Sequence, residues 1–342
     1  MEFVSPQSNF TAEVVRRGLL RSAPFQLMDI GCSGGIAPTW RVYEPDLRAL
    51  GVDPVVAECA RLTAAEKNPQ VRYQAAFVGL PDDHPFNRAR SGEPPTRRNP
   101  WARLSSATAT EFLAQRVTQE TKLPVLNTWQ AEPLAPVRKF TVDELAAREG
   151  LTQLDFLKID IDGHDLEALH SAEKLIREGP VLGLALEVNY YGSTLAHEHT
   201  FHNTDRLMRA WGFDLFGLTT RKYSAGALPH RFVWDMPAQA QGGRPYQGDA
   251  LYLRDAIGLE GMSDLPVLSP VKLLKLACLF ENFSLPDFAA ELVAKHGVKM
   301  GLDPAPALDL LTRTLRHDEV GYQEHLRRFR ENPASFYLSG SM

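Results

Sequence analysis

The chain has 342 residues, of which 44% are hydrophobic, so it can bury a sizeable core and has room for two or more domains. Its 37 basic and 42 acidic residues give a formal net charge of -5, which excludes a global positive field that would attract nucleic acid or anionic lipid. The three cysteines, Cys32, Cys59 and Cys278, form neither a disulfide framework nor a CxxC metal pattern. We therefore expect a protein of the reducing cytoplasm.

The N-terminal segment is predicted to be a short helix followed by a strand. Apolar residues at helical spacing indicate a helix over residues 9–20. The first 23 residues contain several charges and no continuous apolar block, so neither a signal peptide nor a membrane anchor is expected. Residues 25–30 are a compact apolar run that ends at glycines, which predicts the first strand.

Apolar runs and helical patterns then alternate along the chain. Strands are predicted over residues 48–52, 71–78, 154–161 and 181–188, and helices over residues 54–67, 142–148, 165–177 and about 205–211. Near-continuous apolar strands separated by helices are typical of a parallel sheet that is covered on both faces. Residues 213–218 and 249–253 are expected to close the sheet as an antiparallel strand pair. The predicted fold is a Rossmann-like, doubly wound α/β sheet.

Two long irregular segments interrupt this pattern, and a leucine-rich region follows it. Residues 81–137 are rich in Pro and Arg, with a possible helix over residues 110–120, and they fit a substrate lid as well as a surface loop. In the second irregular segment, 221–247, the basic and aromatic residues 221–234 suit a polar glycan or an anionic acceptor, and they equally suit a solvated hairpin loop. The predicted organisation is an N-terminal helix (1–23), an α/β domain (24–255) with insertions at 81–137 and 221–247, and a small helical C-terminal domain (265–342).

A glycine-rich turn follows the first predicted strand, and its open backbone allows a ligand to approach closely. The turn lacks the GxGxxG spacing of dinucleotide-binding enzymes. Asp53 ends the next predicted strand, where a carboxylate can accept both ribose hydroxyls of a nucleoside or can simply start the following helix. Asp29 lies inside an apolar strand and needs partners, either loop amides or a ligand amino group reached through water. The candidate nucleoside site comprises Asp29, Gly31, Cys32, Ser33, Gly34, Gly35 and Asp53.

A second motif has a buried strand that ends in carboxylates, Leu157-Lys-Ile-Asp160-Ile-Asp162-Gly-His164-Asp165. Together with the preceding Phe140-Thr-Val-Asp-Glu-Leu145, it is similar to the hallmark of the FkbM family of S-adenosylmethionine-dependent methyltransferases. The resemblance covers roughly residues 24–255, although Asp162 replaces the usual Glu and His164 stands at a position that is more often small. It implies a class I methyltransferase fold and methyl transfer to an acceptor oxygen, commonly on a sugar or a secondary metabolite.

The acidic strand end supplies the candidate catalytic residues Asp160, Asp162 and His164. Transfer of a sulfonium methyl depends mainly on alignment of the reacting atoms, but a hydroxyl acceptor must also lose its proton. A histidine side chain is the usual general base near neutral pH, so His164 can take that role, while Asp160 can orient it or the acceptor. Two other readings stay open, namely Mg²⁺ binding by Asp160 and Asp162 and simple stabilisation of a helix N-terminus.

A histidine cluster follows the fifth predicted strand and comprises His197, His199 and His202. A loop could gather the three imidazoles around Zn²⁺ or Fe²⁺, or they could contact substrate or be plain surface residues. Asn203 and Thr204 are predicted to start the next helix. The expected partner is a small-molecule or glycan acceptor, with no nucleic acid and no membrane span. A nicotinamide-dependent oxidoreductase and a non-catalytic glycan-binding or assembly protein remain alternatives, and the oligomeric state is open.

Overall fold

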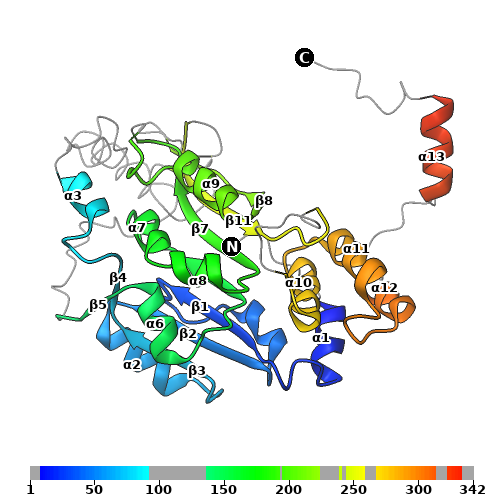
Figure 1. Ribbon diagram of the computed structural model, residues 1–342, viewed down its shortest axis with the longest axis horizontal. Helices are drawn as coiled ribbons and strands as arrows, with labels where there is room; N and C mark the ends of the chain where they lie inside the picture. Colours follow the sequence, from blue (N-terminus) through cyan, green and yellow to red (C-terminus); the bar gives the residue numbers. More distant parts are fainter. Residues whose placement is uncertain are drawn as a thin grey trace, which may run out of the picture.

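The structure is a computed structural model that describes residues 8–91, 136–192, 195–223, 239–240, 244–258, 267–312 and 322–332 (Figure 1). The predicted helix at 110–120 lies outside these residues, as do most of the insertions at 81–137 and 221–247. Within the described ranges, no helix is both long and apolar enough to cross a membrane.

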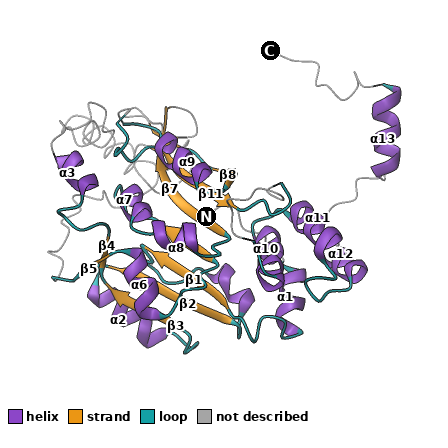
Figure 2. Cartoon of the chain, in the orientation of Figure 1, coloured by secondary structure: helices purple, strands orange, loops and turns teal. Residues whose placement is uncertain are grey.

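Nine of the described strands form one sheet, whose order is β10-β9-β11-β7-β6-β1-β2-β3 with β8 paired to β11 (Figure 2). The strands are β1 Phe25–Ile30, β2 Leu47–Asp53, β3 Val71–Ala75, β6 Phe156–Ile159, β7 Gly183–Asn189, β8 Asp214–Leu218, β9 Arg221–Tyr223, β10 Gln239–Ala240 and β11 Arg244–Leu253. Strands β3, β2, β1, β6 and β7 are parallel, while β11 runs antiparallel to both β7 and β8. The predicted parallel sheet with a terminal antiparallel pair is confirmed, and β11 lies between β7 and β8.

Helices cover both faces of the sheet, as a doubly wound fold requires. The helical segments are α1 Asn9–Arg16, η1 Pro38–Tyr43, α2 Val56–Ala65, α3 Pro85–Ser91, α6 Val142–Glu149, α7 Asp165–His170, α8 Glu173–Glu178, α9 Phe201–Ala210, α10 Pro270–Asn282, α11 Pro286–His296, α12 Pro304–Thr312 and α13 Tyr322–Glu331. One core includes Met28 and Ile30 of β1 and packs against α6, α7, α8 and α9. The other includes Leu27 of β1 and packs against α1, η1 and α10. Alternation along β1 therefore separates the two cores.

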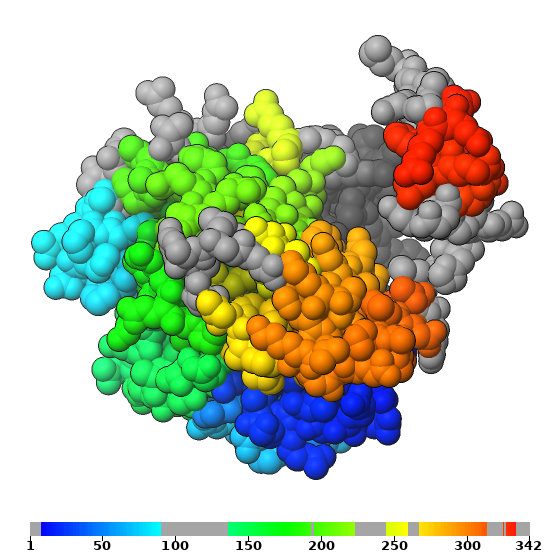
Figure 3. Space-filling model, turned by 45° about the vertical axis from the view of Figure 1, so that its right-hand side comes forward, coloured from blue at the N-terminus to red at the C-terminus, as the bar shows by residue number. Residues whose placement is uncertain are grey.

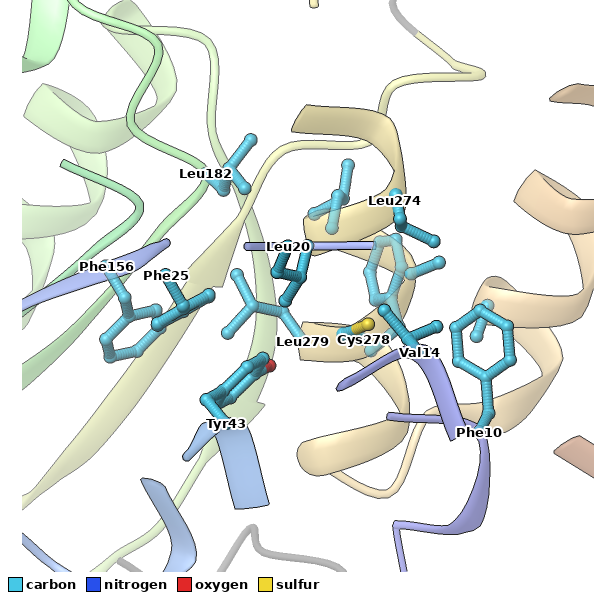
Figure 4. Packing of buried hydrophobic residues seen from close by; sticks show 14 of the residues in the cluster. Phe10, Val14, Leu20, Phe25, Tyr43, Phe156, Leu182, Leu274, Cys278 and Leu279 are labelled. Carbon is cyan, nitrogen blue, oxygen red and sulfur yellow. The ribbon is translucent and has the colours of Figure 1, made fainter. Parts of the chain in front are cut away.

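The C-terminal helices share their core with the N-terminal helix and the sheet. Leu274, Cys278 and Leu279 of α10 lie in the same buried cluster as Phe25 and Phe156 (Figure 4). From outside, the orange helices α11 and α12 lie against the blue N-terminal segment (Figure 3). These contacts mean that α10, α11 and α12 complete one face of the α/β unit. The boundaries proposed from sequence for a separate C-terminal domain stay a prediction.

Two predicted elements are interrupted in the structure, each by a long-range hydrogen bond. The strand expected over 71–78 breaks at Ala76, whose amide donates to the Asp53 carbonyl, and continues as β4 Phe77–Val78, which pairs with β5 Lys139–Phe140. The helix expected over 165–177 splits into α7 and α8 at Ser171. There the Ser171 side chain and carbonyl accept the first amides of α6.

Two predicted boundaries also shift. The helix expected to start at Asn203 and Thr204 begins instead at Phe201. Asn203 does not cap this helix, because its side-chain Nδ2 donates to the Leu195 and Glu198 carbonyls of the preceding loop. The strand expected over 154–161 is shorter, since β6 ends at Ile159 and leaves Asp160 at the start of a turn.

Candidate active site

A cavity of about 410 Å³ opens at the carboxyl ends of β1, β6 and β7. Ligands of open parallel sheets bind at this edge. One wall is the glycine-rich turn after β1 together with the start of η1, which contributes Pro38 and Thr39. The opposite walls carry six charged side chains, Asp29, Lys158, Asp160, Glu187, Arg221 and Asp249.

Strand register explains why these charged side chains meet. Asp29 of β1 lies directly opposite Lys158 of β6, and Glu187 of β7 lies opposite Asp249 of β11. Residues two apart on a strand share a face, and Ala185 links the two pairs because it is the partner of Lys158. A row of charges therefore crosses four neighbouring strands on one face of the sheet, at the end that ligands approach.

The first pair in this row joins the glycine turn to the acidic end of β6. Lys158 Nζ lies 3.0 Å from Asp29 Oδ1, 3.2 Å from the Gly31 carbonyl oxygen and 3.6 Å from Asp160 Oδ2. Burial raises the pKa of Asp29 although Lys158 opposes this. Burial would lower the pKa of Lys158, but Asp29 and Asp160 outweigh it and raise that pKa. Asp29 is thus paired with a lysine, where the sequence suggested loop amides or a ligand amino group.

The glycine turn packs tightly against the end of β6. Gly31 has φ +83°, and a Cβ atom there would lie 1.8 Å from the carbonyl oxygen of Asp160, so only glycine fits. Gly34 has a similar φ of +85°, but a Cβ there would meet open space. Its amide donates to Glu58 Oε1 at 3.0 Å. Of the residues expected at this site, Asp29, Cys32, Ser33 and Gly35 line the cavity, whereas Gly31, Gly34 and Asp53 do not.

Cys32 and Asp53 stand close to this turn in different roles. Cys32 is buried, and burial raises the pKa of its thiol, so it serves as a small packing group. Asp53 ends β2, and its Oδ1 accepts a hydrogen bond from the Val55 amide at 2.8 Å. The Gly31 and Cys32 amides both donate to the Val52 carbonyl, which places the glycine turn beside the end of β2. The two halves of the expected nucleoside site are therefore adjacent.

The three expected catalytic residues occupy one tight turn but point to different places. Asp160 lines the cavity, while neither Asp162 nor His164 is among its lining residues. Asp162 has φ +56°, which is unusual for a non-glycine residue, and Asp165 stabilises the turn by accepting the Ile161 and Gly163 amides at 2.9 Å each. Of the three residues, the structure brings only Asp160 to the cavity.

His164 lies in a separate polar cluster. Its Nδ1 lies 3.2 Å from Oε2 of the buried Glu167, which also accepts hydrogen bonds from Lys139 and Asn87. Burial alone would raise the pKa of Glu167, but these three partners outweigh it and lower that pKa to about 2. Glu167 therefore stays ionised and can orient the His164 ring through Nδ1, an arrangement that is compatible with a general base. The argument against that role is position, because His164 does not line the cavity.

Glu187 is the most deeply buried carboxylate of the cavity wall after Asp29, with 4% of its surface exposed. Its Oε1 accepts hydrogen bonds from Gln247 Nε2 at 2.6 Å and from Arg221 Nη1 at 3.1 Å. Its Oε2 is also buried and has no hydrogen-bond partner among the described residues. Burial, reinforced by Asp160 and Asp165, raises the pKa of Glu187 to about 8 against the opposing effect of Arg221.

The sequence analysis did not assign Lys158, Glu187, Arg221, Gln247 or Asp249 to the site. A signal was present, because Lys158 and Glu187 are charged residues inside otherwise apolar strand runs. A charge in a buried strand requires a partner or a ligand, and this is the reason already applied to Asp29. What the sequence lacked was the register that puts these charges on one face.

The expected histidine cluster does not form. His199 is buried, with Nε2 3.0 Å from the Glu187 carbonyl oxygen and Nδ1 3.2 Å from the Asn189 side-chain amide. A carbonyl only accepts, so Nε2 carries a proton and Nδ1 can accept from Asn189. The ring centroids of His197 and Phe86 are 6.5 Å apart, and His202 is exposed. Across the described residues, no group of three or more His, Cys, Asp or Glu side chains could hold a metal, so the three histidines do not form a metal site there.

The strand order, the antiparallel strand at the edge and the cavity at the glycine turn define a ligand-binding α/β protein of the Rossmann-like class I type. The family model described as methyltransferase FkbM domain matches residues 103–215 of the chain. The match includes β6 with its acidic turn and β7, and it confirms the resemblance seen in the sequence motifs. Residues 103–215 of the chain are thus similar to the methyltransferase FkbM domain.

Solved structures of other methyltransferases are similar to the chain only distantly. They include magnesium protoporphyrin IX methyltransferase from Synechocystis with bound S-adenosylhomocysteine (10% identity, covering 72% of this chain and 82% of that one, TM-score 0.30). Another is an O-methyltransferase from Bacillus cereus in complex with S-adenosylhomocysteine, which is 13% identical, covers 73% of this chain and 82% of its own, and has a TM-score of 0.32. No curated protein matches the chain. Because both TM-scores are low, the fold assignment rests on the strand order itself.

Proposed function

We propose that this protein transfers the methyl group of S-adenosylmethionine to a hydroxyl group of a sugar, a glycan or a secondary metabolite. The observation that carries the proposal is the cavity between the glycine turn and the charged row. It presents four carboxylates, Asp29, Asp160, Glu187 and Asp249, against two cations, Lys158 and Arg221. Such a carboxylate-rich wall favours a cationic ligand, and S-adenosylmethionine carries a sulfonium and an ammonium group.

The neighbouring strand ends suit the nucleoside part of the donor. Asp53 at the end of β2 can accept the ribose hydroxyls through the carboxylate oxygen that the Val55 amide does not use. Val55 and Phe77 are large apolar residues with 40% and 41% of their surfaces exposed, and they follow the ends of β2 and β3. An adenine ring offers the flat apolar surface that such side chains can cover. The residues present therefore fit the donor.

The chain's own contribution to the reaction would be alignment within the charged row. S-adenosylmethionine supplies an activated methyl group on a positively charged sulfur. Lys158 fixes Asp29 and lies close to Asp160, so the two carboxylates keep a defined spacing at the mouth of the glycine turn. Asp160 can then accept a hydrogen bond from a neighbouring donor group of the acceptor and so hold the reacting oxygen toward the methyl group, which lowers the entropic part of the barrier.

Calorimetric titration of the purified protein with S-adenosylmethionine and S-adenosylhomocysteine tests this function, with NAD as the control ligand. We expect micromolar binding of the first two only, with the same affinities in EDTA-treated and Mg²⁺-supplemented samples. Binding of NAD alone would support the oxidoreductase alternative. A folded sample that binds none of the three would support the non-catalytic alternative. The family match favours the first outcome.

Replacing Asp53 by asparagine is expected to weaken S-adenosylhomocysteine binding by about 1–3 kcal/mol, because a charged hydrogen bond to ribose is lost. Asparagine keeps a side-chain oxygen that can accept the Val55 amide, so the start of α2 should be preserved. The measurement is calorimetry alongside thermal unfolding. Unchanged affinity in a normally stable variant would remove the ribose assignment.

The Asp160→Asn variant is expected to lower turnover by at least tenfold while S-adenosylhomocysteine affinity changes less than threefold. Asp160 lines the cavity with 38% of its side chain exposed, so the change removes a charge at the acceptor rather than a core contact. Turnover and binding are measured on the same preparation. Asp83→Asn, an exposed residue outside the cavity, is the matched control. Full activity of Asp160→Asn would contradict the assigned role.

A further inference from the structure

We propose that Glu187 is the catalytic base of this enzyme, and that its Oε2 atom receives the proton of the acceptor hydroxyl. The inference rests on the proposed function and adds to it a residue that neither the sequence motifs nor the family match assigns. It also gives distinct roles to two neighbours, because Gln247 and Arg221 become positioning residues for the Glu187 carboxylate.

The first argument is the asymmetry of the two Glu187 oxygens. Oε1 is held by two donors, Gln247 Nε2 at 2.6 Å and Arg221 Nη1 at 3.1 Å. Oε2 is buried and has no partner among the described residues, although Glu187 lines the cavity. A buried carboxylate oxygen without a partner costs free energy unless a ligand supplies the missing hydrogen bond. An acceptor hydroxyl is a donor of the right kind.

The second argument is the position of Glu187 relative to the other groups of the cavity. The glycine turn and Asp29 mark the donor end on β1, whereas Glu187 lies two strands away on β7. Asp160 at the end of β6 lies between them along the strand order. An acceptor held beside Asp160 would therefore have the methyl donor on the β1 side and a proton acceptor on the β7 side. No other described carboxylate of the cavity combines burial with an unpartnered oxygen.

The charges that face Glu187 come from several elements. Asp160 and Asp162 follow β6, Asp165 begins α7, and each of them disfavours ionisation of Glu187. Arg221 of β9 favours ionisation, and it is shared with Asp249 of β11 at 3.2 Å. Burial is the main cause of the shift, and together with these charges it raises the pKa of Glu187 to about 8, which makes its carboxylate a stronger base than an ordinary glutamate.

The proposed step is balanced within the enzyme, donor and acceptor. The acceptor oxygen forms a bond to the methyl carbon while the bond from that carbon to sulfur breaks, and its electron pair stays on sulfur, which becomes a neutral thioether. The O–H bond of the acceptor breaks, and its proton forms a bond to Oε2 of the ionised Glu187. The protonated carboxyl group then releases this proton to water when product leaves.

The test compares wild type with Glu187→Gln, Gln247→Leu and the exposed control Glu178→Gln. Release of S-adenosylhomocysteine is measured from pH 6 to 10 with methyl glycosides of common hexoses as acceptors, and S-adenosylhomocysteine binding is measured by calorimetry. We expect Glu187→Gln to lose at least about 100-fold in kcat, with binding changed less than threefold. The wild-type rate should rise with pH through a midpoint near 8, where Glu187 ionises, and level off above it, and Glu187→Gln should lose this dependence.

The Gln247→Leu variant keeps the base and removes one donor to its carboxylate. We therefore expect it to remain active and to shift the rise in rate toward higher pH, a change that a merely structural role would not produce. A Glu187→Gln enzyme with near wild-type turnover and an unchanged pH profile would overturn the proposal while leaving the proposed function intact. Wild-type protein that binds no S-adenosylhomocysteine would overturn the proposed function and this base with it.

Discussion

The Asp155→Asn variant is expected to lose about 3–5 kcal/mol of unfolding free energy, because the change removes the negative charge from a buried ionic cluster. Asp155 precedes β6 and is fully buried. Its two carboxylate oxygens accept Lys272 Nζ at 2.6 Å and Lys275 Nζ at 2.7 Å, and both lysines belong to α10. One oxygen also accepts the Gln26 amide at the start of β1. Asparagine would leave two buried ammonium groups facing each other without a counter-charge.

The loss is measured by urea unfolding followed by circular dichroism, with the exposed Asp83→Asn variant as the matched control. The control should stay within about 0.5 kcal/mol of wild type. Lys275→Met is a second variant that leaves one lysine with one carboxylate, and we expect it to cost less than Asp155→Asn. Equal stability of wild type and Asp155→Asn would show that α10 is held by its apolar contacts alone.

The same cluster shows what could not be predicted from sequence. Lys272 and Lys275 lie in a largely apolar helical run, where a charge requires a partner, but nothing near them in the chain indicates that this partner is Asp155. The apolar spacing of α10 predicts a helix because periodicity is a local property. The surface that this helix covers depends on contacts more than a hundred residues away, so its place in the core of the α/β unit had to come from the structure.

The sheet could be predicted from sequence because its strands follow from local patterns in the chain. Strand β1 has the predicted bounds, and the parallel order follows from apolar runs that alternate with helices. The predicted strand and helix that break at Ala76 and Ser171 do so because distant backbone groups take up their hydrogen bonds. Local secondary-structure propensity does not indicate such distant hydrogen-bond partners.

In the candidate site, too, residues adjacent in the chain could be predicted and residues brought together by strand order could not. The glycine turn and Asp160 could be placed from sequence because a strand end, a turn and a carboxylate are adjacent in the chain. Glu187 and Lys158 could not be assigned to the site from sequence, since their place in it depends on which strands are neighbours. The predicted histidine cluster is wrong for the opposite reason. His197, His199 and His202 are close in sequence, but a turn and the start of α9 direct them to different surroundings.

The close approach of the glycine turn to β6 leads to the second large effect, at Gly31. The Gly31→Ala variant is expected to lose about 2–5 kcal/mol of unfolding free energy, from a positive φ and from overlap with neighbouring backbone. The added Cβ would lie 1.8 Å from the Asp160 carbonyl oxygen, which belongs to the backbone and cannot rotate away. The turn and the end of β6 must then separate, and this distorts the cavity wall that holds Asp29 and Lys158.

Gly34→Ala provides a matched control, because Gly34 has nearly the same φ but a Cβ there meets nothing within 4 Å. It should cost only the conformational part, about 1–2 kcal/mol. Urea unfolding gives both values, and calorimetry with S-adenosylhomocysteine is expected to show a larger loss of affinity for Gly31→Ala. Equal effects of the two substitutions would mean that backbone conformation alone requires these glycines. A larger effect at Gly31 would establish that contact between the glycine turn and the acidic end of β6 shapes the donor site.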